Sequence, residues 1–143
     1  MCPSKAKKKK ILVLCTHNSA RSQIAEGLFR HLAGDKFDVE SAGSSPCGVN
    51  PFVIKVLTQE GIDASGQYSK NVSSFKNEKF DYVITVCANA EKSCPLFIGT
   101  YEKLHWPLED PAKTQGSEEE IICAFCKTRD KLKTLISEFL KGK

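Results

Sequence analysis

The sequence predicts an α/β fold, built as a single domain in which a four-stranded parallel sheet is flanked by helices. Its 143 residues are enough for one domain with one sizeable core. Short apolar runs typical of strands alternate with segments of helical periodicity, and no internal repeat or linker divides the chain. This alternation favours right-handed crossovers and helices that cover both faces of the sheet.

The first half of the chain supplies two strands and two helices. Residues 10–15 form an apolar run between charged and polar residues, which predicts a buried strand. Residues 19–33 predict a helix that ends before Gly34, and residues 37–43 predict a second strand. Asn50 and Pro51 open another helix, which ends at Gly61. The residues expected to face the core are Ile24, Leu28 and Leu32 in the first helix and Phe52, Val53, Val56 and Leu57 in the second.

The second half completes the sheet and adds one long helix. Residues 80–86 predict a strong strand, and residues 101–106 predict a fourth. Ser117 is expected to cap a final helix that reaches about Leu140. Three glutamates follow Ser117, and acidic side chains suit the positive end of a helix dipole.

Composition and charge narrow the functional class. The chain is 41% hydrophobic and 27% charged, and it contains no apolar run of the roughly 18 residues that span a membrane. Its net charge of +4 owes much to five lysines within the first ten residues. We therefore expect residues 1–9 to be a basic flexible tail, residues 10–143 to form the domain, and the protein to act in the cytoplasm without binding nucleic acid or membrane.

Seven cysteines without an export signal argue against a disulfide framework and leave redox chemistry, metal binding or burial. Cys123 and Cys126 share one side of the final helix, so burial beside Ile122 and Leu132 is expected. Cys2 and Cys47 are isolated, and no second cysteine pair completes a zinc site. We expect no metal site.

A loop with the pattern Cys-x5-Arg joins the first strand to the first helix. It begins at Cys15 and ends at Arg21, and its backbone N–H groups can turn inward to hold an anion beside the helix N-terminus. The Arg21 guanidinium matches oxyanion geometry, and Ser22 is placed to hydrogen-bond the thiol. The alternative is a buried structural cysteine beside a surface arginine. The predicted oxyanion-binding residues are Thr16, His17, Asn18, Ser19, Ala20, Arg21 and Ser22.

Three reactive side chains lie just after predicted strands. Parallel sheets bind ligands beyond the carboxyl ends of their strands, where Cys15, Cys87 and Asp110 fall. Prolines on both sides hold Asp110 in a stiff loop, which makes it a candidate general acid. Glu109 is the nearest alternative candidate for the general acid. Asp110 could also be a turn residue that faces solvent and has no catalytic role.

The loop and its neighbours resemble the low-molecular-weight protein tyrosine phosphatase superfamily, which includes tyrosine phosphatases and thioredoxin-coupled arsenate reductases. The resemblance rests on residues 15–26, on Ser41-Ala42-Gly43 and on Asp110-Pro111, and it extends from Lys10 to about Leu140. It implies a flavodoxin-like architecture. It also implies that Cys15 is the nucleophile, that Arg21 and the loop amides hold the oxyanion, and that Asp110 is the general acid.

Other residues resemble the reductases more than the phosphatases. Cys87 and Cys94-Pro95 match their cysteine pair, and His105-Trp106 also resembles them. The phosphatases place aromatic residues after Asp-Pro, where this chain has Ala112 and Lys113. The resemblance implies arsenate as substrate, with phosphate and sulfate competing. Cys87 and then Cys94 would act as redox-active resolving thiols, with no bound cofactor, external thioredoxin as the electron donor and a monomeric enzyme.

Alternatives remain at this point. The chain could be a tyrosine phosphatase that uses only Cys15, Arg21 and Asp110, or a phosphate-binding module without catalysis. Some of these reductases bind a potassium ion through residues that match Asn18, Glu26 and Ser41. Lys70 matches the fourth position, so we expect its ammonium to replace the ion. His17 and Ala20 depart from the family pattern, in which Gly and Cys are common.

Overall fold

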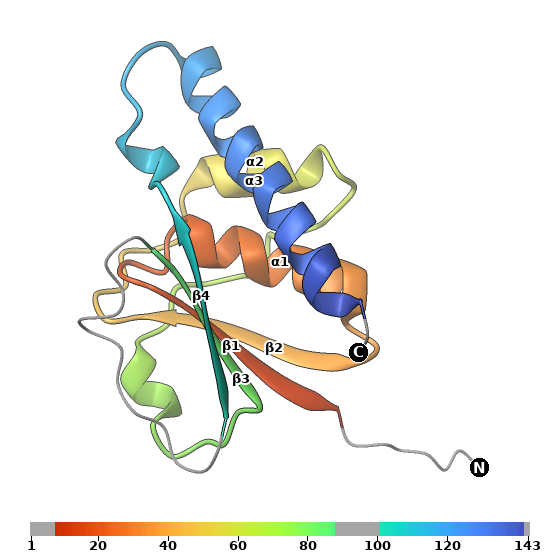
Figure 1. Cartoon of the computed structure of the whole chain (residues 1–143). Helices are drawn as coiled ribbons and strands as arrows, with labels where there is room; N and C mark the ends of the chain where they lie inside the picture. The colour runs from red at the N-terminus through yellow and green to blue at the C-terminus, as the bar shows by residue number, and fades with distance from the viewer. Residues whose placement is uncertain (1–7, 88–100, 142–143) are drawn as a thin grey trace.

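A four-stranded parallel sheet forms the centre of the molecule (Figure 1). The computed structural model describes residues 8–87 and 101–141. The strands are β1 (Lys9–Cys15), β2 (Phe37–Gly43), β3 (Tyr82–Cys87) and β4 (Glu102–Leu108), and they lie in the order β2-β1-β3-β4. All three pairings are parallel, which confirms the predicted fold class.

The three α-helices pack on one face of the sheet (Figure 1). They are α1 (Arg21–Ala33), α2 (Pro51–Thr58) and α3 (Glu118–Leu140). Strand side chains alternate between the two faces, so Ile11, Val13 and Ile84 point toward these helices. The other face packs Leu12, Leu14 and Val83 against Phe75 and Phe80.

The second face of the sheet is covered differently from the prediction, which placed helices on both faces. In the described part of the chain, that face carries the short 3-10 helix η1 (Val72–Phe75). The chain reaches it after α2, through a polar stretch that lacks the apolar periodicity of an amphipathic helix.

Several element boundaries also differ from the prediction. β1 begins at Lys9, inside the predicted tail, and β4 continues to Leu108. The first helix begins at Arg21 rather than at residue 19, because Ala20 has φ −124° and ψ −79° and lies outside the helical region. α2 ends at Thr58, earlier than Gly61, which has φ 75°.

Two predictions of burial were wrong. Leu32 is 43% exposed, because the buried face of α1 is centred on Ile24 and Leu28 without reaching Leu32. Cys123 is exposed, because the face that α3 turns inward is centred on Phe125 and Leu132. Cys126, like Ile122, is partly buried and packs against the core, so the prediction fails only for Cys123. Helical spacing correctly places the two cysteines near each other, but it does not say which side of the helix is covered.

The predicted cap of α3 is present. The Ser117 hydroxyl accepts a hydrogen bond from the backbone N–H of Glu120 at 3.2 Å, and the Glu120 carboxylate accepts one from the backbone N–H of Ser117 at 3.0 Å. The hydrogen bond from the Ser117 backbone N–H is the main cause that lowers the pKa of Glu120, and a hydrogen bond from the Ser117 hydroxyl lowers it further. This capping box fixes where α3 begins after the loop that carries Asp110.

Candidate active site

The carboxyl ends of the strands bring the predicted residues to one edge of the sheet. Cys15 ends β1 and is paired in register with Gly43 at the end of β2. Cys87 ends β3 and is paired with Leu108 at the end of β4, two residues before Asp110. The predicted resolving residue Cys94 lies outside the described residues.

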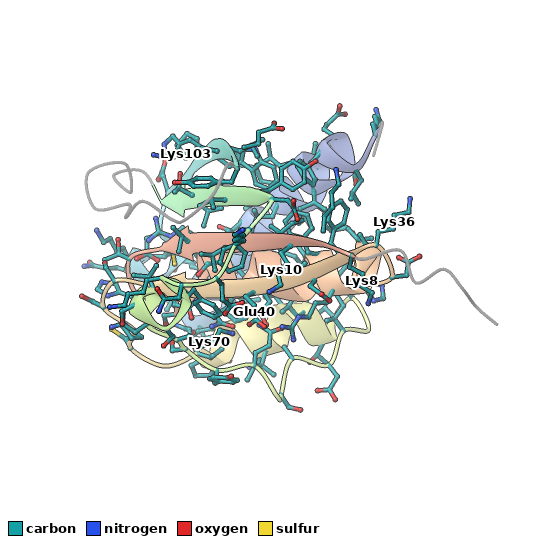
Figure 2. All side chains as sticks on the ribbon, turned by 90° about the horizontal axis from the view of Figure 1, so that it is seen from below. Lys8, Lys10, Lys36, Glu40, Lys70 and Lys103 are labelled. Atoms are coloured by element: carbon teal, nitrogen blue, oxygen red, sulfur yellow. The ribbon has the colours of Figure 1, made fainter. Side chains whose placement is uncertain are left out.

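The lysines at the start of the described chain are at the other end of the sheet. Lys8 and Lys10 lie where β1 begins (Figure 2), and β1 is seven residues long. At about 3.3 Å per residue, roughly 20 Å separate them from Cys15. These two lysines therefore do not line the site.

The loop after β1 turns its carbonyl groups outward. The carbonyl oxygens of Thr16, His17 and Ser19 accept hydrogen bonds from the backbone N–H groups of Ser45, Cys47 and Asn50 at 2.8, 3.1 and 3.0 Å. The Asn18 carbonyl accepts from the Ser69 hydroxyl at 2.6 Å, and that of Ala20 accepts from the backbone of Ile24 at 2.9 Å. These bonds hold the carbonyls on the outer side of the loop, the arrangement in which its N–H groups can line an anion-binding nest.

A small pocket opens inside the loop. Its volume is about 100 Å³, well below the ~300 Å³ or more of a site for an organic ligand. Ala20, the residue that precedes α1, provides no side-chain cap, so the first amides of the helix are free to attract an anion. The residues that line the pocket are Cys15, His17, Ser19, Ala20, Arg21, Cys47, Asp110 and Ala112.

Arg21 is buried and only partly satisfied by protein groups. Its Nη1 donates to the carbonyl of Leu108 at 3.0 Å, and its Nη2 lies 3.6 Å from Asp110 Oδ2. Its Nε has no hydrogen-bond partner among the described residues. A buried donor without an acceptor costs about 1–3 kcal/mol, which an oxyanion in the pocket would recover.

Asp110 is better placed than Glu109 to act as the acid. Its Oδ1 accepts from the backbone N–H of Ala112 at 3.0 Å and caps the 3-10 helix η3 (Pro111–Lys113), while its Oδ2 faces Arg21. Glu109 is exposed and does not line the pocket. The structure thus favours Asp110 over its nearest competitor.

A chain of buried hydrogen bonds leads to the Cys15 sulfur. Its Sγ lies 2.8 Å from the Ser22 hydroxyl, which accepts from Asn18 Nδ2 at 2.8 Å. The orientation of the Asn18 side-chain amide is fixed by the backbone N–H of Lys70. This N–H can only donate, so the atom that it meets at 2.8 Å is the acceptor Asn18 Oδ1. Because Asn18 donates to Ser22, the Ser22 hydroxyl hydrogen is free to point at the sulfur, where it stabilises a thiolate.

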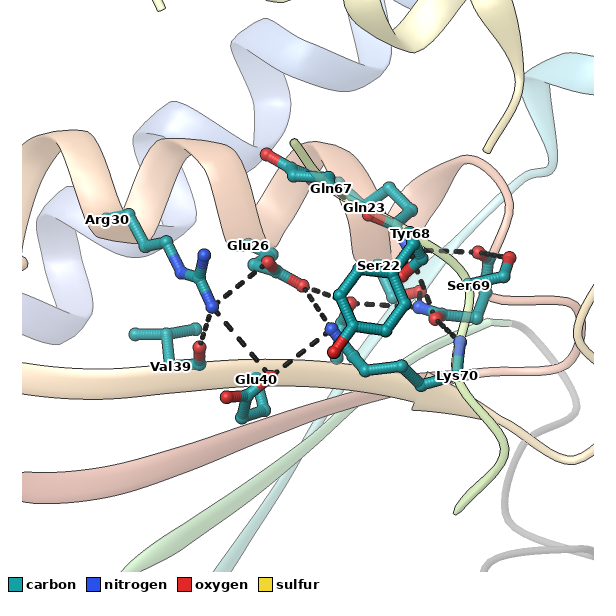
Figure 3. A network of polar contacts seen from close by, with 12 residues as sticks. Ser22, Gln23, Glu26, Arg30, Val39, Glu40, Gln67, Tyr68, Ser69 and Lys70 are labelled. Carbon is teal, nitrogen blue, oxygen red and sulfur yellow. Dashed lines mark hydrogen bonds and ion pairs between the residues drawn. The ribbon is translucent and has the colours of Figure 1, made fainter. Parts of the chain in front are cut away.

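The same chain continues to a buried carboxylate (Figure 3). Asn18 Nδ2 also donates to Ser41 Oγ at 2.9 Å, and Ser41 donates to Glu26 Oε1 at 2.5 Å. Glu26 is 1% exposed, so it needs positive partners. Lys70 Nζ lies 3.4 Å from Glu26 Oε1 and 3.2 Å from Glu40 Oε1 (Figures 2 and 3), and Arg30 lies 3.2 Å from Glu26 Oε2.

Sequence reasoning missed part of this support. Gln23 is fully buried, and its Nε2 donates to Asn18 and, at 3.0 Å, to the Tyr68 carbonyl. Ser69 holds the outer side of the loop. The contacts with Tyr68 and Ser69 join residues more than 40 positions apart, and the only local signal was a glutamine beside the apolar stripe of α1.

Gly43 allows β2 to approach the loop, and replacing it should disturb the site. A Cβ there would lie 2.6 Å from the Thr16 carbonyl oxygen and 2.8 Å from the backbone N of Asn18. Neither backbone atom can move without shifting the loop. We expect Gly43→Ala to weaken inorganic phosphate binding, measured by titration calorimetry, by about 10²-fold.

Gly66→Ala is the matched control, because a Cβ at this exposed glycine meets nothing within 4 Å. It should leave phosphate binding unchanged. Equal binding by the Gly43 and Gly66 variants would show that the close approach of β2 to the loop is unimportant.

Among the described residues, no group of three His, Cys, Asp or Glu side chains could hold a metal ion. In the same part of the chain, no helix has the length and apolar content needed to cross a membrane.

Comparison with known proteins gives consistent matches. The family model described as "Low molecular weight phosphotyrosine protein phosphatase" matches residues 10–142. An arsenate reductase of Halalkalibacterium halodurans is 42% identical over 132 residues, which cover 92% of this chain and 95% of the relative.

Solved structures agree. An arsenate reductase in the phosphate-binding state superposes with a TM-score of 0.73 at 32% identity, covering 91% of this chain and 98% of that one. A thioredoxin-dependent arsenate reductase of Corynebacterium glutamicum superposes with a TM-score of 0.68 at 28% identity, covering 97% of this chain and 65% of that one.

Proposed function

This chain belongs to the low molecular weight phosphotyrosine protein phosphatase family, with arsenate reductases as relatives, and we propose that it reduces arsenate to arsenite through three cysteine thiols. The observation that carries the proposal is the pocket itself. It is sized for a small anion and is lined by Cys15, by Asp110 and by Arg21, whose buried Nε has no partner among the described residues.

The first step joins the substrate to the enzyme. Cys15 Sγ attacks arsenic while the loop N–H groups and Arg21 bind the arsenate oxygens. A sulfur–arsenic bond forms and an arsenic–oxygen bond breaks. The departing oxygen leaves as water with a proton from Asp110, which lies 3.6 Å from Arg21 at the pocket edge.

The next two steps move electrons. Cys87 attacks the Cys15 sulfur, arsenic leaves as arsenite with the bonding electron pair, and a Cys15–Cys87 disulfide remains. Cys94 then attacks Cys87, which frees Cys15 and leaves a Cys87–Cys94 disulfide. Two thiols are thereby oxidised for each arsenic reduced from the +5 to the +3 state. The position of Cys87 at the end of β3, at the same sheet edge as Cys15, supports this order.

An external dithiol must reduce the final disulfide. We propose that thioredoxin does so, in the cytoplasm, with a monomeric enzyme that needs no bound cofactor. The thioredoxin-dependent relative from Corynebacterium glutamicum supports the choice of donor. The relative in a phosphate-binding state supports competition by phosphate, and we extend this to sulfate because both are tetrahedral oxyanions.

Phosphatase activity is the second candidate, because the same pocket contains every group that aryl phosphate hydrolysis needs. Cys15, Arg21 and Asp110 would suffice, with water completing the reaction. We therefore expect weak phosphatase activity beside arsenate reduction. A phosphate-binding module without catalysis would show neither activity.

The Cys94→Ser variant tests the proposal. With thioredoxin, its reductase and NADPH, the native enzyme should consume NADPH continuously when arsenate is added. Cys94→Ser should stop after at most one arsenite per chain, yet hydrolyse p-nitrophenyl phosphate within about twofold of the native rate. Cys123→Ser, at an exposed cysteine outside the pocket, is the matched control and should keep both activities. No arsenate-dependent NADPH consumption by the native enzyme would reject the proposal.

A second expectation concerns potassium. The Lys70 ammonium already lies among the oxygens of Glu26 and Glu40, so we expect replacing sodium by potassium to change kcat/KM less than twofold. Lys70→Ala should lower the free energy of unfolding by about 2 kcal/mol. This is less than is usual for breaking a buried pair, because Arg30 still faces Glu26.

Steady-state rates in matched potassium and sodium buffers check the first part, and urea unfolding checks the second. A large gain in rate with potassium in the native enzyme would contradict the replacement of the ion by Lys70. In Lys70→Ala, by contrast, a rate gain with potassium is expected, since a site for the ion has been opened.

A further inference from the structure

A second cysteine borders the oxyanion pocket. Cys47 lies in the exposed segment after β2 and lines the pocket together with Cys15. Its backbone N–H donates to the His17 carbonyl at 3.1 Å, and the neighbouring Ser45 N–H donates to the Thr16 carbonyl at 2.8 Å. The backbone around Cys47 is therefore held against the loop that carries the nucleophile.

His17 contacts this thiol. Its Nδ1 lies 3.4 Å from Cys47 Sγ and 3.2 Å from the Ser45 carbonyl oxygen. The carbonyl can only accept, so a hydrogen bond to it requires the tautomer that carries the proton on Nδ1. As a thiol, Cys47 donates to the Ser45 carbonyl at 3.4 Å. When the exposed sulfur attacks, an imidazole N–H beside it can stabilise its negative charge, and in this sense His17 activates Cys47.

We propose that Cys47 is a second resolving thiol for the arsenate adduct on Cys15. The proposal rests on the proposed function, which supplies that adduct. The Cys47 thiolate attacks the Cys15 sulfur, the sulfur–arsenic bond breaks, and arsenic leaves as arsenite with the electron pair. A Cys15–Cys47 disulfide forms. Two thiols are oxidised and arsenic is reduced by two electrons, so arsenate is the only oxidant the step needs.

The local backbone suits such a bond. A disulfide requires Cα atoms within about 7 Å, and a segment without regular structure can reach that geometry more easily than a helix or strand. Residues 44–50 contain no helix or strand, and Gly48 has φ 91° with open space around it. The route gives the adduct an exit that does not depend on Cys87.

The test removes the proposed resolving pair and asks whether arsenite still forms. Cys87→Ser/Cys94→Ser protein is mixed with excess arsenate, arsenite is quantified, and disulfides are mapped by peptide mass spectrometry. We expect about one arsenite per chain and a peptide pair joined through Cys15 and Cys47. Adding Cys47→Ser should lower the arsenite yield at least tenfold. Adding Cys123→Ser, the matched control, should not change it.

Hydrolysis of p-nitrophenyl phosphate shows that each variant retains a folded site. No arsenite from the Cys87→Ser/Cys94→Ser protein, or an equal yield after Cys47 is also replaced, overturns the role of Cys47. Failure of the native enzyme in the thioredoxin assay would instead reject the proposed function, so the two failures are distinguishable.

The role of His17 has its own readout. His17→Gln removes the imidazole donor and should slow alkylation of Cys47 by iodoacetamide several-fold, as followed by mass spectrometry. Alkylation of Cys123 in the same protein is the internal reference. An unchanged Cys47 rate would overturn activation by His17.

Discussion

Replacing Arg21 by alanine is expected to lower kcat/KM for both arsenate reduction and aryl phosphate hydrolysis by about 10³-fold. Removing one oxyanion donor typically costs 10²–10³-fold, and the alanine variant also loses the full positive charge that faces the pocket. The Nε group is the donor that the described residues leave unpaired. The loss corresponds to about 4 kcal/mol of transition-state stabilisation.

Arg21→Lys separates charge from geometry. Lysine keeps the charge but has no rigid fork, so it cannot bond the Leu108 carbonyl and the anion together as the guanidinium can. We expect a loss of about 10²-fold, between the native enzyme and the alanine variant. Steady-state kinetics of all three proteins provide the measurement. Full activity of the lysine variant would mean that only the charge matters.

Much of the fold could be predicted because its signals are local. The apolar run before Cys15 and the capping pattern from Ser117 to Glu120 each need only neighbouring residues, and both were confirmed. Which side of a helix is covered depends on its distant neighbours. This is why Leu32 and Cys123 are exposed against expectation.

The features of the site also fall into those that local sequence predicts and those that depend on distant contacts. Cys15, Arg21 and Asp110 were found from a motif and from their positions after strands, and the structure brings them to one pocket. The outward carbonyls of the loop and the pairing of Cys47 with His17 depend on contacts between the loop and the segment that follows β2. No spacing in the sequence encodes those contacts, so they could not be predicted.

Loss of the Asn18 side chain should destabilise the protein strongly. It is fully buried with φ 47°, and its side chain bonds Ser22, Ser41, Gln23 and the backbone of Lys70. Asn18→Ala leaves these groups without their partner, at about 1 kcal/mol or more each, and places alanine in the left-handed region at about 1 kcal/mol. We expect the free energy of unfolding to fall by about 5 kcal/mol, measured by urea denaturation.

Asn18→Gly separates the two contributions. Glycine adopts a positive φ without strain but also lacks the hydrogen-bonding amide, so it should be about 1 kcal/mol more stable than the alanine variant. Both variants should lose most of their catalytic activity, because Ser22 no longer has the donor that directs its hydroxyl toward Cys15. If either variant had the same midpoint of urea unfolding as the native protein, the buried hydrogen bonds of Asn18 would not be what holds the loop in place.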